Sequence, residues 1–174
     1  MPVGEVEGED IYQAYIGSSA NPGWRDFAVG SDIVRGKVAP PAVSFDVNPA
    51  SRQTLEILIA GSRLGAMVAA GARIHQAGCN GCIGMGQAPA VGRNSLRTVP
   101  RNFPGRSGTR DDSVFLCSPE TAAASVLTGK ITDPRSLDMP YPRLRYPDNT
   151  VVTASMLHDA PQPDTPPPLV SARQ

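Results

Sequence analysis

An α/β domain with a mostly parallel sheet is the fold class that the sequence predicts, and three features predict it. Short apolar runs with aromatic or β-branched residues alternate with segments of helical periodicity. Loops rich in glycine, proline and serine separate them, and one alanine-rich segment carries clear helix-capping residues. We therefore expect a small three-layer domain whose functional loops gather outside the carboxyl ends of the strands.

The first half of the chain predicts two strands and three helices. Residues 11–16 form an aromatic and β-branched run that Gly17 ends, as expected of a buried strand. Residues 42–47 alternate small or polar side chains with apolar ones, which favours a second strand. The predicted helices are 24–34, a helix that follows residues 48–51 and ends at Gly61, and a short helix at 64–70.

The second half contains the longest irregular stretch and the clearest helix. In order, we expect a short segment at 72–75, irregular chain to Gly92, an arginine-rich loop at 94–110 and a strand at 113–117. Ser118 is a good N-cap, and Pro119 suits the first helical position. The helix should end before Gly129.

Composition limits the functions that the chain can have. Basic and acidic residues number 16 each, so the formal net charge is zero and nothing electrostatic points to nucleic acid or a membrane surface. No apolar run suits a membrane span or a signal peptide, so we expect a soluble, cytoplasmic protein with reduced thiols. Proline concentrates after Asp133, which predicts an N-terminal extension at 1–10, a domain at 11–133 and an extended Pro-rich tail at 134–174.

Two cysteines, Cys79 and Cys82, lie three positions apart in a glycine-rich segment. Such a pair can be a redox dithiol, half of a zinc site or part of an iron–sulfur site. Zinc needs four ligands, and the third cysteine, Cys117, lies in an apolar run where a free thiol usually acts as a small buried hydrophobe. His75 is better explained as a strand histidine held by a hydrogen bond than as a ligand.

Arg101 and Arg106 lie among prolines and glycines, so they cannot be the solvated face of a helix. A planar guanidinium binds carboxylates with two hydrogen bonds, which favours an acidic substrate. The alternative is that these arginines pair with the nearby acids Asp111, Asp112 or Glu120.

Four motifs in order resemble the aconitase family, which includes the isopropylmalate isomerases. They are Tyr15 to Asn21 (YIGSSAN), Gly78 to Gly84 (GCNGCIG), Arg101 to Arg106 (RNFPGR) and Ser118 to Thr121 (SPET). The resemblance extends from Ile11 to about Asp133. It implies the third of three α/β domains around a 4Fe–4S cluster, followed by the start of the linker to a fourth domain.

The resemblance also implies a chemistry. Cys79 and Cys82 match two of the three cluster ligands, and Ser19 stands at the position of the third, where the family has cysteine. Arg101 and Arg106 match the arginines that face substrate. The family dehydrates and rehydrates hydroxy di- or tricarboxylates, as in citrate to isocitrate in the tricarboxylic acid cycle, with one cluster iron as Lewis acid.

Catalytic residues that the family takes from its other domains have no counterpart in this sequence. We therefore expect one domain of an aconitase-like hydro-lyase that is inactive alone, with the missing parts supplied by other aconitase-like domains in trans or by a longer product of the same gene. The alternative is a non-catalytic remnant or binding module that keeps the fold. A redox domain is less favoured, because Cys82 is predicted to lie in coil.

Overall fold

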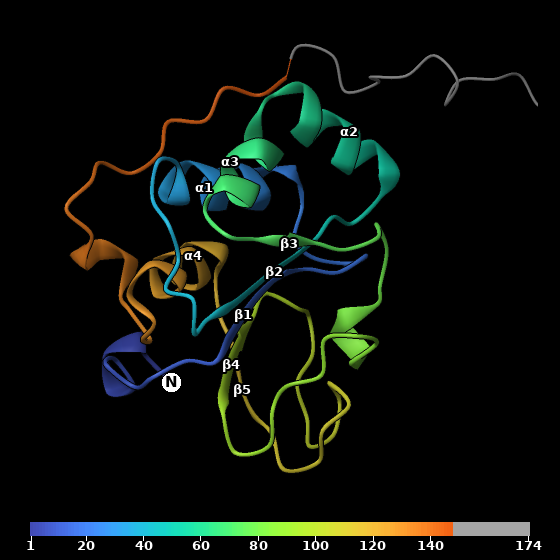
Figure 1. Cartoon of the computed structure of the whole chain (residues 1–174), viewed down its shortest axis with the longest axis vertical. Helices are drawn as coiled ribbons and strands as arrows, with labels where there is room; N and C mark the ends of the chain where they lie inside the picture. The colour runs from blue at the N-terminus through green and yellow to red at the C-terminus, as the bar shows by residue number, and fades with distance from the viewer. Residues whose placement is uncertain (148–174) are drawn as a thin grey trace, which may run out of the picture.

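Five parallel strands form one sheet in the computed structural model, which describes residues 1–147 (Figure 1). The strands are β1 (Gln13–Gly17), β2 (Ser44–Asn48), β3 (Arg73–Ile74), β4 (Asn94–Arg97) and β5 (Ser113–Leu116). Their order across the sheet is β3-β2-β1-β4-β5, and every pair is parallel. The predicted α/β class with a parallel sheet is confirmed.

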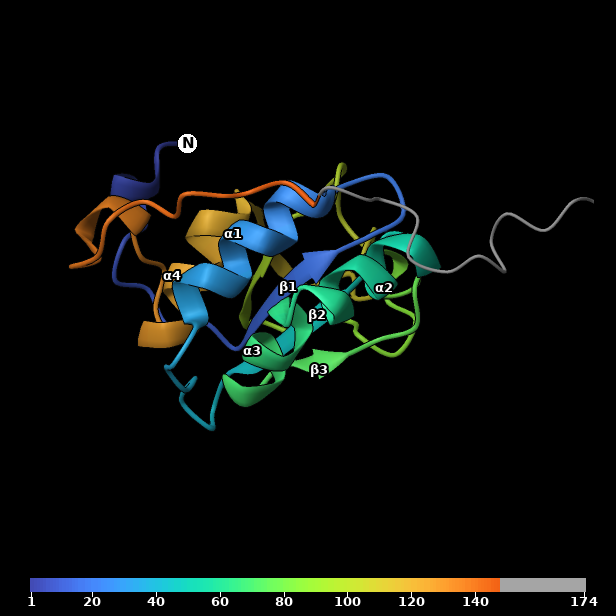
Figure 2. The same cartoon turned by 90° about the horizontal axis from the view of Figure 1, so that it is seen from above.

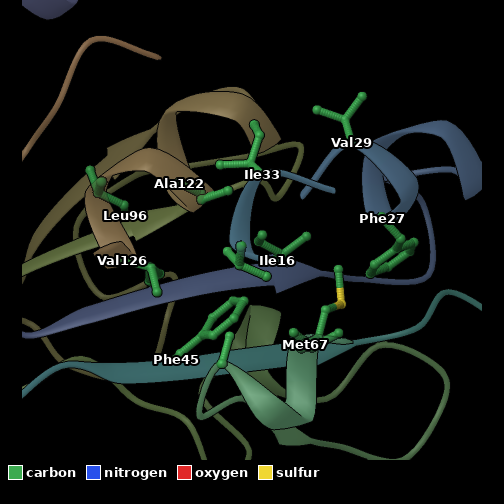
Figure 3. Packing of buried hydrophobic residues seen from close by; sticks show 14 of the residues in the cluster. Ile16, Phe27, Val29, Ile33, Phe45, Met67, Leu96, Ala122 and Val126 are labelled. Carbon is green, nitrogen blue, oxygen red and sulfur yellow. The ribbon is translucent and has the colours of Figure 1, made fainter. Parts of the chain in front are cut away.

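All four α-helices cover the same face of the sheet (Figures 1 and 2). They are α1 (Trp24–Val34), α2 (Arg52–Ala60), α3 (Arg63–Ala69) and α4 (Pro119–Thr128). Alternate strand residues, among them Ile16, Phe45 and Leu96, point toward these helices and form the apolar core with them (Figure 3). Packing between α1, α3 and α4 closes this side of the molecule.

The opposite face of the sheet is polar, although it is buried. Tyr15, Asp46 and Arg97 alternate with the core residues and are each 0% exposed. Irregular chain between β3 and β4, rather than a second layer of helices, covers them. The three layers are therefore helices, sheet and a loop segment that includes the short 3-10 helix η2 (Gly81–Ile83).

Strand β4 corrects the sequence prediction, which placed residues 94–110 in one arginine-rich loop. The strand pairs with β1 on one side and β5 on the other. Its only apolar side chain is Leu96, which enters the core, while Ser95 and Arg97 enter the polar layer. Because that layer is buried and hydrophilic, the strand lacks the apolar pattern by which strands are recognised.

The first residues and the segment that follows α4 lie against the helical side of the domain. The 3-10 helix η1 (Val3–Glu5) precedes β1, and η3 (Pro134–Ser136) follows α4. Beyond η3 the chain extends over the helices, where the Tyr141 hydroxyl donates to Glu120 at 2.8 Å. The predicted tail beyond residue 147 lies outside the described residues, and the division at 133 stays a prediction. No helix in the described part is long and apolar enough to cross a bilayer.

Candidate functional site

Two loops meet where the strand order reverses between β1 and β4. The backbone N–H of Gly17 donates to Thr98 Oγ1 at 3.1 Å, and Asn21 Nδ2 donates to the Thr98 carbonyl at 2.7 Å. A Cβ at Gly17 would lie 2.4 Å from the Asn48 carbonyl oxygen, so only glycine fits this close approach. Such a reversal at the carboxyl edge is where parallel α/β sheets bind ligands.

The serine loop after β1 presents Ser19 to solvent. Ser18 is buried, and its hydroxyl accepts from the backbone N–H groups of Ala20 and Asn21, both at 3.3 Å. The same hydroxyl donates to the Asn21 carbonyl at 2.7 Å. Ser18 therefore closes the turn, whereas exposed Ser19 has no hydrogen-bond partner among residues 1–147 and remains available to a ligand.

The cysteine loop joins Cys79 and Cys82 by a disulfide, with their Cα atoms 6.0 Å apart. The expectation of reduced thiols is therefore wrong for this pair, because the turn around η2 brings both sulfurs together. Cys82 is 1% exposed, whereas Cys79 is exposed. Within the described chain, no three His, Cys, Asp or Glu side chains converge as metal ligands.

The arginine loop packs directly against the cysteine loop. Arg106 is half-buried, and its Nη1 donates to the Cys82 carbonyl at 2.7 Å. Gly84 lies so close to the arginine loop that a Cβ there would be 2.3 Å from the Ser107 carbonyl oxygen. These contacts place two predicted site residues, Cys82 and Arg106, side by side.

Arg101 lies in the same loop but faces solvent. Across the described residues, no ion pair joins Arg101 or Arg106 to Asp111, Asp112 or Glu120. Glu120 pairs instead with Arg25 at 3.1 Å. The interpretation of the two arginines as partners of local acids is therefore wrong.

Cys117 and His75 take the structural roles expected from the sequence. Cys117 is a free thiol that packs beside the helical core, and its burial raises the thiol pKa to about 12. His75 Nε2 lies 2.9 Å from the buried carboxylate of Asp46. Both side chains are thus accounted for without a ligand.

Sequence reasoning missed Arg97, which lies beneath the cysteine loop. Its Nη1 donates to the Gly81 carbonyl at 2.6 Å, and its guanidinium carbon lies 5.1 Å from the centre of the Tyr15 ring. The sequence gives no sign that Arg97 points toward the cysteine loop, because β4 itself was not predicted as a strand.

The fold and the site define a class: a parallel α/β domain in which the loops that follow its strands carry a cysteine pair, an exposed serine and two arginines. The model of the aconitase family (aconitate hydratase) matches residues 2–129. The chain belongs to the aconitase family.

Relatives within this family are similar to most of the chain. The chain is 42% identical over 137 residues to 3-isopropylmalate dehydratase large subunit 1 of Methanopyrus kandleri, which covers 78% of this chain and 32% of that protein. It is 37% identical over 138 residues to the homoaconitase large subunit of Thermus thermophilus, covering 78% of this chain and 33% of that protein. The chain therefore spans about a third of the length of the curated relatives it matches.

Proposed function

We propose that this chain is the cluster-binding domain of an aconitase-family hydro-lyase. The observation that carries the proposal is the contact between the cysteine loop and the arginine loop, with Arg106 bonded to the backbone of Cys82. Metal ligands and carboxylate-binding groups would thus share one edge of the sheet. Family membership supports the reaction type, the dehydration and rehydration of a hydroxy acid.

Cys79 and Cys82 would hold a 4Fe–4S cluster, with Ser19 in the place of a third ligand. The donor atoms of the chain fit this in part: two sulfurs meet at one turn and become thiolate donors once a reductant cleaves their disulfide, and one exposed hydroxyl lies on the loop after β1. When bound, such a cluster supplies a Lewis acid for the hydroxyl and carboxylate of the substrate. A serine oxygen is a harder donor than a thiolate, so the cluster should be held weakly.

Arg101 and Arg106 would bind the carboxylates of the substrate. Arg101 is exposed and has no ion-pair partner among residues 1–147, so its guanidinium can form a bidentate pair with a carboxylate. Arg106 already donates one N–H to the cysteine loop and can offer the others. The names of the relatives favour isopropylmalate or homoaconitate chemistry over that of citrate.

The remaining catalytic groups would come from other aconitase-like domains. The relatives are large subunits about three times the length of the matched region, which supports this division. We expect the purified chain to give no turnover of 3-isopropylmalate, homocitrate or citrate, even after reconstitution with iron and sulfide. Turnover by the chain alone would contradict this part of the proposal.

Anaerobic reconstitution tests the cluster directly. The reduced chain, incubated with iron and sulfide and then desalted, should gain visible charge-transfer absorbance. Cys79→Ala should lose that absorbance, whereas Cys117→Ala should keep it, because Cys117 packs beside the helical core. Equal absorbance in wild type and Cys79→Ala would show that the iron is bound elsewhere.

A binding module without catalysis is the second candidate, and Ser19 is the observation that favours it. With two thiols on the loop and a hydroxyl as the third donor, the site could retain carboxylate binding without a cluster. The same reconstitution separates the two candidates: if no absorbance develops while isopropylmalate still binds by calorimetry, the binding module is supported.

A further inference from the structure

Arg97 is a fully buried cation that makes no direct ion pair in the described chain. It is 0% exposed, and none of the ion pairs among residues 1–147 includes it. Burial lowers the pKa of its guanidinium to about 10. The carboxylates of Asp46 and Asp112 raise the pKa of Arg97 without forming an ion pair with it, and burial outweighs them. Because neither carboxylate pairs directly with the guanidinium, its hydrogen bonds must offset much of the desolvation penalty.

Those hydrogen bonds go to the cysteine loop and to two strand residues. Nη1 donates to the Gly81 carbonyl at 2.6 Å, and Nη2 donates to the carbonyl of Gln87. Nη2 also donates to Gln13 Oε1 at 2.7 Å, and Nε donates to Ser95 Oγ at 3.1 Å. One guanidinium thus joins both ends of the turn that contains Cys82 to the centre of the sheet.

We propose that Arg97 is a positioning residue that holds the cysteine loop in the conformation in which Cys79 and Cys82 face each other. The Gly81 carbonyl belongs to the peptide that leads into Cys82, so fixing it fixes the backbone of that cysteine. The loop is rich in glycine and has little regular structure, so its ordering has a high entropic cost. Charge-assisted hydrogen bonds in a buried setting are strong enough to oppose that cost.

The surroundings of Arg97 fix its own orientation. Gln13 accepts from Arg97 and also donates to the buried carboxylate of Asp46 at 3.1 Å, so the guanidinium belongs to a network that crosses β1 and β2. The ring of Tyr15 lies against the guanidinium, with its centre 5.1 Å from the guanidinium carbon. A Cβ at Gly81 would be 2.5 Å from Tyr15 Cε2, which shows how closely the loop approaches this network.

Hydrogen exchange followed by mass spectrometry tests the proposal on the cluster-free chain. In Arg97→Met, amides of residues 79–88 should exchange at least about tenfold faster, while those of β1 and β2 keep their protection. Arg97→Lys keeps the charge but has one donor nitrogen in place of three, so it should recover part of the protection. Arg93→Met is the control, because the exposed Arg93 side chain stacks on Tyr12 and makes no hydrogen bond to the cysteine loop within residues 1–147. Unchanged exchange in 79–88, or equal acceleration throughout the sheet, would overturn the proposal.

Wild-type protein gives a second test that needs no substitution, should Arg97→Met fail to fold. If Arg97 holds the loop, reducing the disulfide should leave the protection of residues 79–88 within about threefold of the oxidised chain. Loss of that protection on reduction would mean that the disulfide alone orders the loop. The relevance of Arg97 to cluster assembly rests on the proposed function, but its effect on loop exchange does not. Failure to bind a cluster would therefore leave this inference standing.

Discussion

Under the proposed function, Ser19 is the residue that would decide how strongly a cluster is held. It is exposed on the loop after β1 and stands where the family resemblance places a cysteine ligand. A thiolate is a softer donor than a serine oxygen and ionises far more easily, so it suits iron–sulfur chemistry better.

Ser19→Cys should therefore strengthen cluster binding. After reconstitution, we expect the visible absorbance to decay at least about tenfold more slowly in the presence of an iron chelator. Ser136→Cys, which adds an exposed thiol on η3, is the control and should decay at the wild-type rate. A wild-type decay rate in Ser19→Cys would remove Ser19 from the ligand set.

Cys117 should be almost inert in the folded chain. Its pKa is raised to about 12 by burial, so at neutral pH it carries roughly a thousandfold less thiolate than an ordinary thiol. Alkylation of the reduced protein at pH 8 should modify exposed Cys79 well before Cys117, as followed by peptide mass spectrometry. In denaturant the two should react alike. Equal rates in the native chain would contradict the burial of the thiol.

At the scale of elements, helix α4 depends on its N-terminal cap. Ser118 Oγ accepts from the Thr121 N–H at 3.1 Å, whereas Ser62 precedes α3 without any capping hydrogen bond from its side chain. Ser118→Ala should lower the free energy of unfolding by about 1 kcal/mol, and Ser62→Ala should change it by less than about 0.5 kcal/mol. Urea denaturation measures both, and equal effects would mean that the cap has no specific role.

Packing between the cysteine and arginine loops can be isolated with two glycines. Gly84 and Gly86 both have positive φ, 86° and 76°, so alanine is strained at either position. Only at Gly84 would the new Cβ collide, 2.3 Å from the Ser107 carbonyl oxygen, whereas Gly86 has open space. Gly84→Ala should therefore cost at least about 1 kcal/mol more than Gly86→Ala in urea denaturation. Equal losses would mean that the two loops do not pack as described.

The elements that the sequence predicted are those in which capping residues and apolar periodicity match the part of the fold that the element packs against. Helix α1 has the predicted limits, and α4 begins at the predicted capping residues. Strand β4 was not predicted, because its residues face a buried layer built from hydrogen bonds, which leaves no apolar pattern. The same layer explains why Arg97 could not be recognised: its partners are distant backbone carbonyls that no sequence pattern encodes.

At the scale of the whole molecule, parallel topology explains why part of the site was predictable. Segments that follow parallel strands meet at one edge, so the loops of Ser19, Cys79 and Arg101 could be expected together from the strand pattern and the motifs. The individual contacts could not be predicted. Arg106 bonds to the cysteine loop, and the two cysteines are joined to each other, because tight turns bring these groups together across the loops.

The chain also spans about a third of the length of its relatives, so under the proposed function it holds one part of a larger active site. The carboxyl edge of the sheet carries the proposed cluster ligands and the proposed carboxylate arginines, and the proposal assigns the remaining catalytic groups to other domains. Under this division, cluster binding can be tested on the chain alone, whereas catalysis needs the other parts.

Anaerobic native mass spectrometry of the reconstituted chain is the most direct test of the central claim, that Cys79 and Cys82 hold an iron–sulfur cluster. We expect a wild-type mass raised by one 4Fe–4S unit and a Cys82→Ala mass without that addition. A wild-type chain that keeps its cluster-free mass after reduction and reconstitution, or a Cys82→Ala chain that gains the same unit, would show that these cysteines hold no cluster.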